Sequence, residues 1–306
     1  MQTENKKRIG IIRGGQGENY TSSLKRGGDI IFHIHENLGD KYKVSDILID
    51  KDGAWHLAGM PIQPADLIHK VDVVWNTTNP NISAILENLS IPHIGISHFS
   101  STLENNQEML CEHMKNIGVT MPKSVVLPVY QPDFDGLREK YVIKKAKEVF
   151  EKFSSPWIVK SFTPDKNMGV HLAKTFGELV DSIEGGVKYE KSILVEEFIA
   201  GKVASVHSLS GFRGEDVYIF PPNDVFGQIS PEQKEELMSL ARSLHSHMGA
   251  KHYLKSNFIL NTRGKVYLVS IESLPNLKKD SHFQQACEKV GAQTHHVIEH
   301  ILNSAL

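Results

Sequence analysis

The chain has 306 residues, enough for about two domains with sizeable cores. Its 34 basic and 36 acidic residues give a formal net charge of −2, which argues against an electrostatic nucleic-acid binder. The two cysteines, Cys111 and Cys287, form neither a zinc-ligand pattern nor a disulfide framework. A polar amino terminus and the lack of an apolar run of about 18 residues favour a cytoplasmic protein without a membrane span. The 16 histidines predict that low pH stresses the fold.

Strands and helices are expected to alternate in the first third of the chain. Short apolar runs predict strands at 7–12, 44–50, 72–76 and 93–96, and helical spacing predicts helices at 22–38 and 82–88. This rhythm is typical of a parallel sheet covered by helices. A glycine turn at 13–17 raises the alternative of a dinucleotide-dependent oxidoreductase. That alternative lacks a G-x-G-x-x-G motif and a well-placed ribose-binding acid.

The rest of the chain has an α+β pattern, with hairpins and intervening helices. A helix over 105–117 is expected to end at Gly118, because glycine readily takes the left-handed conformation that follows a helix. Other helices are predicted at 141–153, 175–185, 231–248 and 282–302. Strands are predicted at 157–160 with a hairpin partner at 170–174, at 192–199, 203–209 and 216–220, and in a hairpin of 253–260 with 265–271.

Several segments carry a family resemblance in their order and spacing. They are residues 11–24, 86–95, 112–122, 156–160, 194–201 and 269–275. Together they resemble the ATP-grasp superfamily, and within it the D-alanine–D-alanine ligases, over nearly the whole chain. The resemblance implies an ATP-grasp fold of α/β and α+β parts. These are a Rossmann-like parallel-sheet domain (1–103), a central lobe (104–199) and a C-terminal lobe (200–306), with a nucleotide cleft between the two lobes.

The resemblance also implies an activity, which is ATP-dependent joining of two D-alanines through an acyl-phosphate, with ATP and Mg²⁺ as cofactors. Lys160 matches the lysine that contacts the ATP phosphates in the family. Lys166 and Gly169 lie in the segment that matches the flap over the phosphates. The residues that match the hinge around the adenine are Glu196, Glu197, Phe198 and Ile199.

The metal-binding positions of the family differ here. They fall on Asn257, Ser270 and Glu272, where the family has two carboxylates and an asparagine. Alternate residues share one face of a strand, so these side chains are expected to converge. Asn257 and Glu272 are the metal candidates, and one carboxylate predicts a weak or single Mg²⁺ site.

The substrate positions also differ. Lys255 matches the oxyanion arginine and keeps its charge, and Ser281 matches a serine that binds the carboxylate of the second substrate; these two are the catalytic candidates. A serine near a helix start is also a common N-cap. Other family positions fall on Gln107, Val203, Thr21, Asn79 and Asn276. A short segment, 223–230, stands in place of the long loop that closes the family's site.

Two functional hypotheses follow. The first is an ATP-dependent carboxylate–amine ligase with altered metal and substrate positions, whose partners are a nucleotide and small amino acids. The second is a catalytically inactive relative that acts as a nucleotide- or protein-binding module. Neither involves nucleic acid or a membrane. Relatives are often homodimers, and the sequence leaves a homodimer open.

Overall fold

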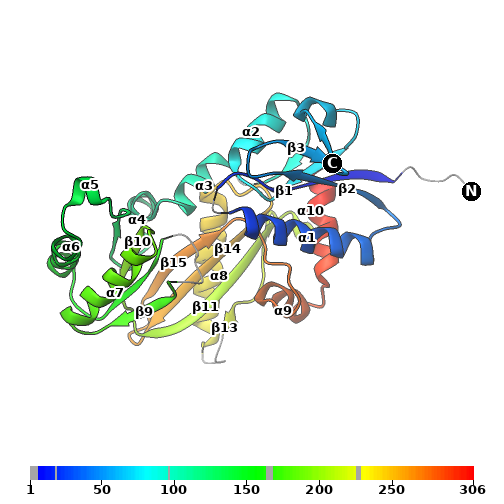
Figure 1. The fold of residues 1–306 in the computed structure, drawn as a ribbon. Coiled ribbons are helices and arrows are strands. Elements are labelled where there is room, and N and C mark those ends of the chain that lie inside the picture. Colours follow the sequence, from blue (N-terminus) through cyan, green and yellow to red (C-terminus); the bar gives the residue numbers. More distant parts are fainter. Residues whose placement is uncertain (1–5, 18, 96, 163–167, 225–228) are drawn as a thin grey trace, which may run out of the picture. The chain divides into compact units, whose positions relative to one another are not determined.

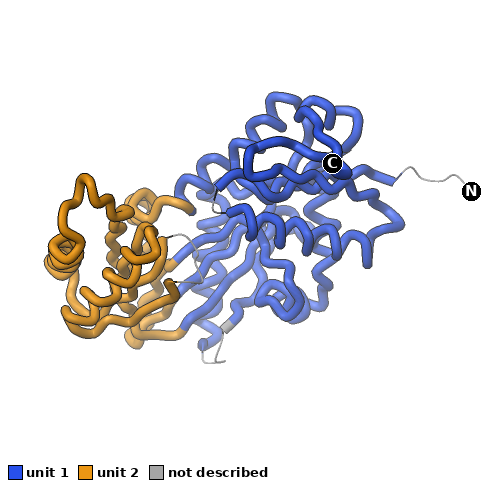
Figure 2. Tube along the Cα trace, in the orientation of Figure 1, with its two compact units in different colours: residues 1–104, 203–258, 270–306 blue, residues 105–202, 259–269 orange. Residues whose placement is uncertain are grey.

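The computed structural model describes residues 6–17, 19–95, 97–162, 168–224 and 229–306. The contacts between residues divide the chain into two compact units (Figure 2). The first unit consists of residues 1–104, 203–258 and 270–306, and the second of residues 105–202 and 259–269. The division into three lobes that the sequence suggests stays a prediction.

A largely parallel sheet forms the amino-terminal part of the first unit (Figure 1). Its strand order is β4-β3-β2-β1-β5-β6. The strands β2, β1, β5 and β6 run parallel, as predicted, and an antiparallel hairpin of β3 and β4 extends one edge. The bounds are β1 (Lys7–Gly14), β2 (Tyr42–Ile49), β3 (Trp55–Leu57), β4 (Met60–Ile62), β5 (Val73–Asn76) and β6 (His93–Ile94).

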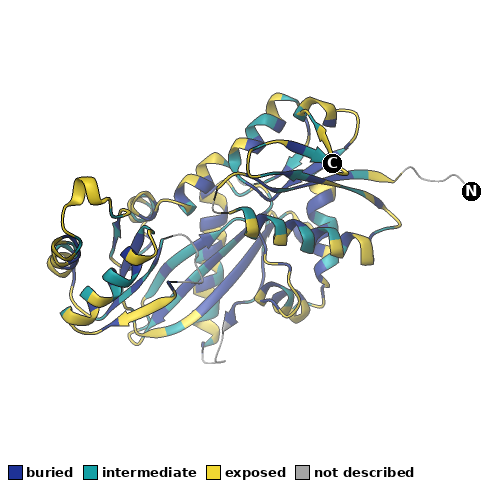
Figure 3. Cartoon of the chain, in the orientation of Figure 1, coloured by how far each residue is buried: buried dark blue, intermediate teal, exposed yellow. Residues whose placement is uncertain are grey.

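This sheet has an apolar core on each face. In β1, Ile9 and Ile11 belong to one core cluster and Ile12 to the other, and all three side chains are fully buried. The helices α1 (Tyr20–Asn37) and α10 (Thr294–Ala305) contribute to the first cluster, and α2 (Pro80–Asn88) contributes to the second. Burial on both faces explains why β1 reads as a continuous apolar run, the signal of a central parallel strand. Figure 3 colours each residue by its burial, and residues 9–12 of β1 are all buried.

Further short elements complete the amino-terminal part. They are the 3-10 helix η1 (Pro64–Leu67) and α3 (His98–Glu104). Neither one is predicted from the sequence.

A second sheet has the strand order β12-β11-β14-β15, with β13 also paired to β11. Its bounds are β11 (Gly201–Ser210), β12 (Val217–Ile219), β13 (Asn223–Asp224), β14 (Tyr253–Asn261) and β15 (Val266–Glu272). The 3-10 helix η2 spans Phe212–Gly214. The helix α8 (Pro231–His247) begins with a capping box in which Ser230 and Gln233 bond each other's backbone N–H groups, which confirms the predicted start.

One predicted helix is wrong. The segment 282–302 forms two helices, α9 (His282–Lys289) and α10, rather than one. Gly291 takes a left-handed φ of +68°, and the N–H of Ala292 bonds to the carbonyl of Cys287. This is the geometry that ends a helix, and Gln293 then starts the next with a capping box. Gly291 marks the end of α9 in the sequence, but the apolar periodicity continues across it and suggests one long helix.

The second unit contains an antiparallel sheet of order β7-β10-β8-β9. Helices α6 and α7 supply apolar residues to the same core cluster as β8 and β10. The predicted hairpin of β8 with β9 is confirmed. Helix α4 ends as predicted at Gly118, whose φ is +78°. The bounds are α4 (Gln107–Asn116), β7 (Ser124–Leu127), α5 (Pro132–Asp135), α6 (Arg138–Lys152), β8 (Trp157–Ser161), β9 (Val170–Ala173), α7 (Phe176–Lys188) and β10 (Ile193–Glu197). None of the helices in the described residues has the length and apolar character to span a membrane.

Candidate functional site

Lys160 is held by a buried carboxylate in the second unit. It lies on β8, and Glu196 lies on the neighbouring strand β10. The Lys160 Nζ atom is 2.5 Å from Glu196 Oε2, and the Glu196 side chain is only 7% exposed. Gln107 Nε2 lies 3.5 Å from the other oxygen of this carboxylate. A buried carboxylate needs such partners, and Lys160 and Gln107 fix the position of the Glu196 side chain.

The hinge residues continue from this ion pair. The N–H groups of Glu197 and Phe198 donate to the carbonyls of Lys123 and Pro156, at 2.8 and 3.0 Å. Their amides are therefore engaged within the unit. Phe198 is 39% exposed, and its aromatic side chain offers a surface for stacking. Ile199, next in the chain, is half-buried.

Of the two residues predicted to lie in the phosphate flap, the structure describes only Gly169. Lys166 lies outside the described residues. Gly169 has a φ of +71°, and a Cβ built on it would have no atom within 4 Å. Its conformation explains the glycine, and its role toward phosphate stays a prediction.

A cluster of four polar side chains lies on β14 and β15 in the first unit. The Lys255 ammonium group donates to Glu272 Oε1 over 2.8 Å. The amide nitrogen of Asn257 donates to the same oxygen over 3.0 Å and to Ser270 Oγ over 2.9 Å. The Ser205 hydroxyl on β11 donates to the amide oxygen of Asn257 over 2.7 Å. The structure thus brings together the residues that the alternation on two adjacent strands predicted.

The donor set of this cluster does not fit a dedicated Mg²⁺ site. Magnesium binds carboxylate and carbonyl oxygens that are free to face it. Here one oxygen of Glu272 accepts two hydrogen bonds, and the amide oxygen of Asn257 accepts one. The Lys255 ammonium group already stands beside the carboxylate as its cation. Among the described residues, no three His, Cys, Asp or Glu side chains gather as metal ligands would.

A cavity of about 250 Å³ in the first unit contains both predicted catalytic residues. Lys255 and Ser281 line it, together with His207, Tyr253 and Asn276 among others. Ser281 Oγ also accepts the Gln284 N–H over 3.2 Å as the N-cap of α9, so this serine has a structural role. The cavity pairs the Lys255 cation with hydroxyl and amide groups and with the exposed carboxylate of Asp280, a combination that suits a small molecule with both charges, such as an amino acid.

The chain is similar to known proteins along nearly its whole length. No family model matches it. The D-alanine–D-alanine ligase of Christiangramia forsetii is 21% identical, over 98% of this chain and 99% of the relative. That of Carboxydothermus hydrogenoformans is 23% identical, over 96% and 97%.

Solved structures agree over the full length. D-alanyl-alanine synthetase A from Vibrio cholerae has a TM-score of 0.78 at 18% identity, covering 98% of both chains. The VanG D-Ala:D-Ser ligase from Enterococcus faecalis has a TM-score of 0.75 at 16% identity, covering 99% of this chain and all of that one. The chain has the ATP-grasp fold of the D-alanine–D-alanine ligases. The resemblance and the fold class inferred from the sequence are both confirmed.

Within this ATP-grasp fold, His207 is a residue that the sequence analysis missed. It lies on β11, and its Nδ1 is 2.8 Å from the hydroxyl oxygen of Tyr253. Its Nε2 is buried with no hydrogen-bond partner among the described residues. Burial, with a smaller contribution from the positive charge of Lys255, lowers the pKa of His207 to about 3. Nothing in its local sequence distinguishes it, because its neighbours in the cavity come from distant segments.

Asn79 has a clear structural reason for its identity in this ATP-grasp chain. Its side-chain oxygen accepts the N–H groups of Asn81 and Ile82, at 3.0 and 3.4 Å, as the N-cap of α2. Asparagine is among the best N-cap residues. The position therefore stabilises the helix start.

Replacing Asn257 with aspartate is expected to strengthen divalent-metal binding. The new carboxylate would face Glu272 at about the distance the amide now spans, and a bound cation would relieve the repulsion between them. Titration of Mn²⁺, followed by the EPR signal of the free ion, is expected to show at least about tenfold tighter binding than in the wild type. Asn261→Asp, on the same strand, is the matched control. Equal Mn²⁺ affinity in both variants would contradict the prediction.

Proposed function

We propose that this chain is an ATP-dependent carboxylate–amine ligase of the D-alanine–D-alanine ligase type, with altered metal and substrate positions. The observation that carries the proposal is the cavity that contains both Lys255 and Ser281. The similarity to ligases over the full length of the chain supports it.

The residues at the nucleotide end have distinct roles in this proposal. Lys160 contacts a phosphate oxygen, while Glu196 fixes the position of its ammonium group. The hinge of Glu196, Glu197, Phe198 and Ile199 receives the adenine, and the exposed ring of Phe198 packs against it. Lys166 and Gly169 belong to the flap over the phosphates.

At the substrate end, Lys255 stabilises the negative charge that develops on the acyl oxygen when the amine attacks. The Ser281 hydroxyl donates to the carboxylate of the second amino acid. A lysine ammonium group serves here where relatives have the bidentate arginine, so the oxyanion receives charge with less directional control. We therefore expect slower turnover than in relatives with the arginine.

A divalent metal would supply phosphate neutralisation if it arrived with the nucleotide. The phosphates and water then provide most of its ligands. The protein contribution is small, because Glu272 is already paired with Lys255.

A second candidate is a nucleotide- or protein-binding module without turnover. The closed network around Glu272 favours it, because Lys255 and Asn257 satisfy that carboxylate without any ligand. Because the Lys255 ammonium group is already paired with Glu272, it would stabilise the negative charge of a transition state less strongly.

Thermal unfolding with and without ATP tests the nucleotide site. Ligand at 100 times its Kd adds about 2.7 kcal/mol of stability, which raises Tm measurably. Lys160→Ala is expected to lose the ATP-dependent increase, whereas Lys147→Ala, which removes an exposed lysine of α6 in the same unit, keeps it. The comparison uses the shift for each variant, because Lys160→Ala also leaves the buried Glu196 without its cation.

An assay for product formation then distinguishes the ligase from the binding module. Release of phosphate coupled to D-alanyl–D-alanine formation supports the ligase. An ATP-dependent shift without turnover on D-alanine or other small amino acids supports the binding module. The absence of any shift at millimolar ATP would overturn the nucleotide site in both.

A further inference from the structure

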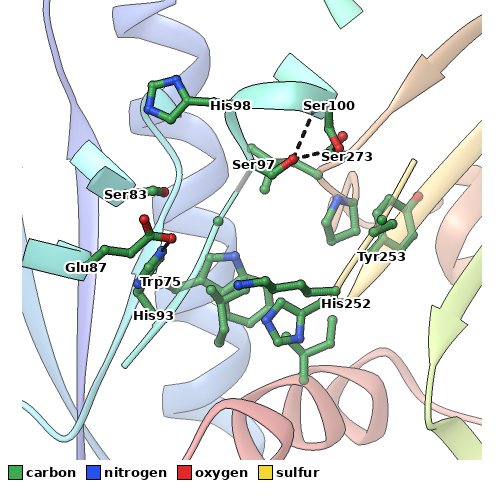
Figure 4. Close-up of a pocket in the computed structure, with 18 residues that line it drawn as sticks. Trp75, Ser83, Glu87, His93, Ser97, His98, Ser100, His252, Tyr253 and Ser273 are labelled. Carbon is green, nitrogen blue, oxygen red and sulfur yellow. Dashed lines mark hydrogen bonds and ion pairs between the residues drawn. The ribbon is translucent and has the colours of Figure 1, made fainter. Parts of the chain in front are cut away.

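A second cavity lies in the first unit, apart from the one that contains Lys255. Its volume is about 240 Å³, and it is lined by β5, α2 and β6 on the amino-terminal side and by residues 249–253 and 273–275 of the later segments (Figure 4). We call it the Trp75 cavity. The proposed function assigns it no role. Tyr253 lines both this cavity and the cavity of the candidate site.

Trp75, one of the residues that line this cavity, carries an unpaired hydrogen-bond donor. Its side chain is 1% exposed, and its indole Nε1–H has no hydrogen-bond partner among the described residues. An indole nitrogen can only donate, so the missing partner is an acceptor. Trp157, buried to the same extent in the second unit, donates to the carbonyl of Phe153 over 3.1 Å. The unpaired donor of Trp75 therefore indicates a place for the acceptor atom of a ligand.

The charged groups of the Trp75 cavity favour an anion. Lys251, His93 and His252 line it. Lys251 supplies the positive charge, because burial lowers the pKa of His252 to about 4 and leaves its imidazole neutral at pH 7. Glu87 is the acidic side chain among the lining residues, and its carboxylate is 3.9 Å from His93 Nε2, beside which Figure 4 shows it. That side chain is 61% exposed, so water screens its charge.

Size and lining restrict the ligand further. A volume of about 240 Å³ suits a small molecule. Apolar side chains, among them Ile94, Leu274 and Ile301, complete the walls. The ligand that matches these features has one anionic end and a short apolar end.

We propose that the Trp75 cavity binds a small organic carboxylate with a short apolar group. One carboxylate oxygen accepts the Trp75 Nε1–H, and Lys251 supplies the positive charge. The apolar group packs against Ile94, Leu274 and Ile301. This site is separate from the proposed ligase chemistry, and it is tested without ATP or D-alanine.

The test follows the tryptophan indole N–H resonances by ¹H–¹⁵N NMR during titration with isovalerate, a short branched carboxylate. Trp75→Phe identifies the resonance of Trp75. We expect this resonance to move downfield and to saturate, because the N–H gains an acceptor, while that of Trp157 stays in place. Lys251→Gln is expected to weaken binding about tenfold, since it removes a charge beside the carboxylate. Lys43→Gln, at an exposed position of β2, is the matched control and keeps the affinity.

Three results would overturn the proposal. The first is a Trp75 resonance that does not move at high millimolar isovalerate. The second is equal affinity for isoamyl alcohol, which has the same branched shape without the charge. The third is unchanged affinity in Lys251→Gln. Inorganic phosphate serves as a further probe, and binding as tight as that of isovalerate would also overturn the proposal, because it would show that the apolar wall contributes nothing.

Discussion

Replacing Gly201 with alanine is expected to lower the free energy of unfolding by about 3 kcal/mol. A Cβ built on Gly201 would lie 2.0 Å from the carbonyl oxygen of Leu260 and 2.9 Å from the Cα of Asn261. Both are backbone atoms of β14, so the clash cannot be relieved by turning a side chain. The strands must separate and give up hydrogen bonds between them.

Urea unfolding, followed by circular dichroism, measures this effect. Gly185→Ala is the matched control in the same unit, because it lies in α7 and a Cβ there would have no atom within 4 Å. That variant is expected to gain up to about 1 kcal/mol, since alanine favours a helix over glycine. Equal stability of the two variants would show that β14 moves aside without cost.

Acid is expected to lower the free energy of unfolding well above the pH at which exposed carboxylates protonate. Burial lowers the pKa of His207 to about 3 and that of His252 to about 4, below the usual 6.5. The unfolded chain therefore binds protons at these positions before the folded chain does. Their contribution to stability is complete above pH 6.5 and is lost as the pH falls toward the folded values. Each histidine costs about 1.4 kcal/mol per pH unit in that window.

Protonation of Glu104 changes the free energy of unfolding in the opposite direction. Burial raises its pKa to about 7, although hydrogen bonds from Ser273 partly oppose this shift. The folded chain takes up this proton between pH 7 and 4.5, before the unfolded chain does, so Glu104 gains stability as the pH falls through that range. The net loss is then about 1.4 kcal/mol per unit from pH 6.5 to 4.5, and it steepens below pH 4.5.

His245 is expected to contribute less than its pKa of about 4 suggests. Each of its ring nitrogens lies 2.8 Å from a serine hydroxyl, of Ser208 and Ser210. These hydroxyls can donate to the carbonyls of Leu254 and Ala250 while they accept from the ring. A protonated His245 would keep all its hydrogen bonds, which reduces the cost of its charge.

Urea unfolding at intervals from pH 7.5 to pH 4 tests the acid prediction. The free energy of unfolding is expected to fall by about 3 kcal/mol between pH 6.5 and 4.5. His207→Gln should make this slope nearly flat, whatever its effect at neutral pH, and His35→Gln, at an exposed position of α1, should leave it unchanged. A wild-type stability that does not vary over this range would contradict the assignment.

Local signals made much of the fold predictable. The helix start at Ser230 and Pro231 and the stop at Gly118 depend on residues within one turn of a helix. The convergence of Asn257 and Glu272 follows from strand alternation, which also needs no distant information. The hairpin of β3 and β4 escaped prediction because its strands are short and one contains Pro61.

Pairings across long stretches of sequence were not predictable. The ion pair of Lys160 with Glu196 and the hydrogen bonds of Glu104 with Ser273 join residues far apart in the chain. Neither member of such a pair differs locally from an exposed residue of its type. Their burial, and with it their chemistry, depends on which strands become neighbours.

The second unit is assembled from two separate stretches of chain, residues 105–202 and the hairpin tip 259–269. The tip is joined to the longer stretch, since the N–H of Leu268 donates to the carbonyl of Thr120 and Gly201 lies against Leu260. A single genetic crossover between this chain and a relative therefore divides at least one unit between two parents. A chimaera that exchanges residues 105–202 alone would pack the strands of one parent against the hairpin of the other. The second unit can be transferred intact only if residues 105–202 and 259–269 come from the same parent.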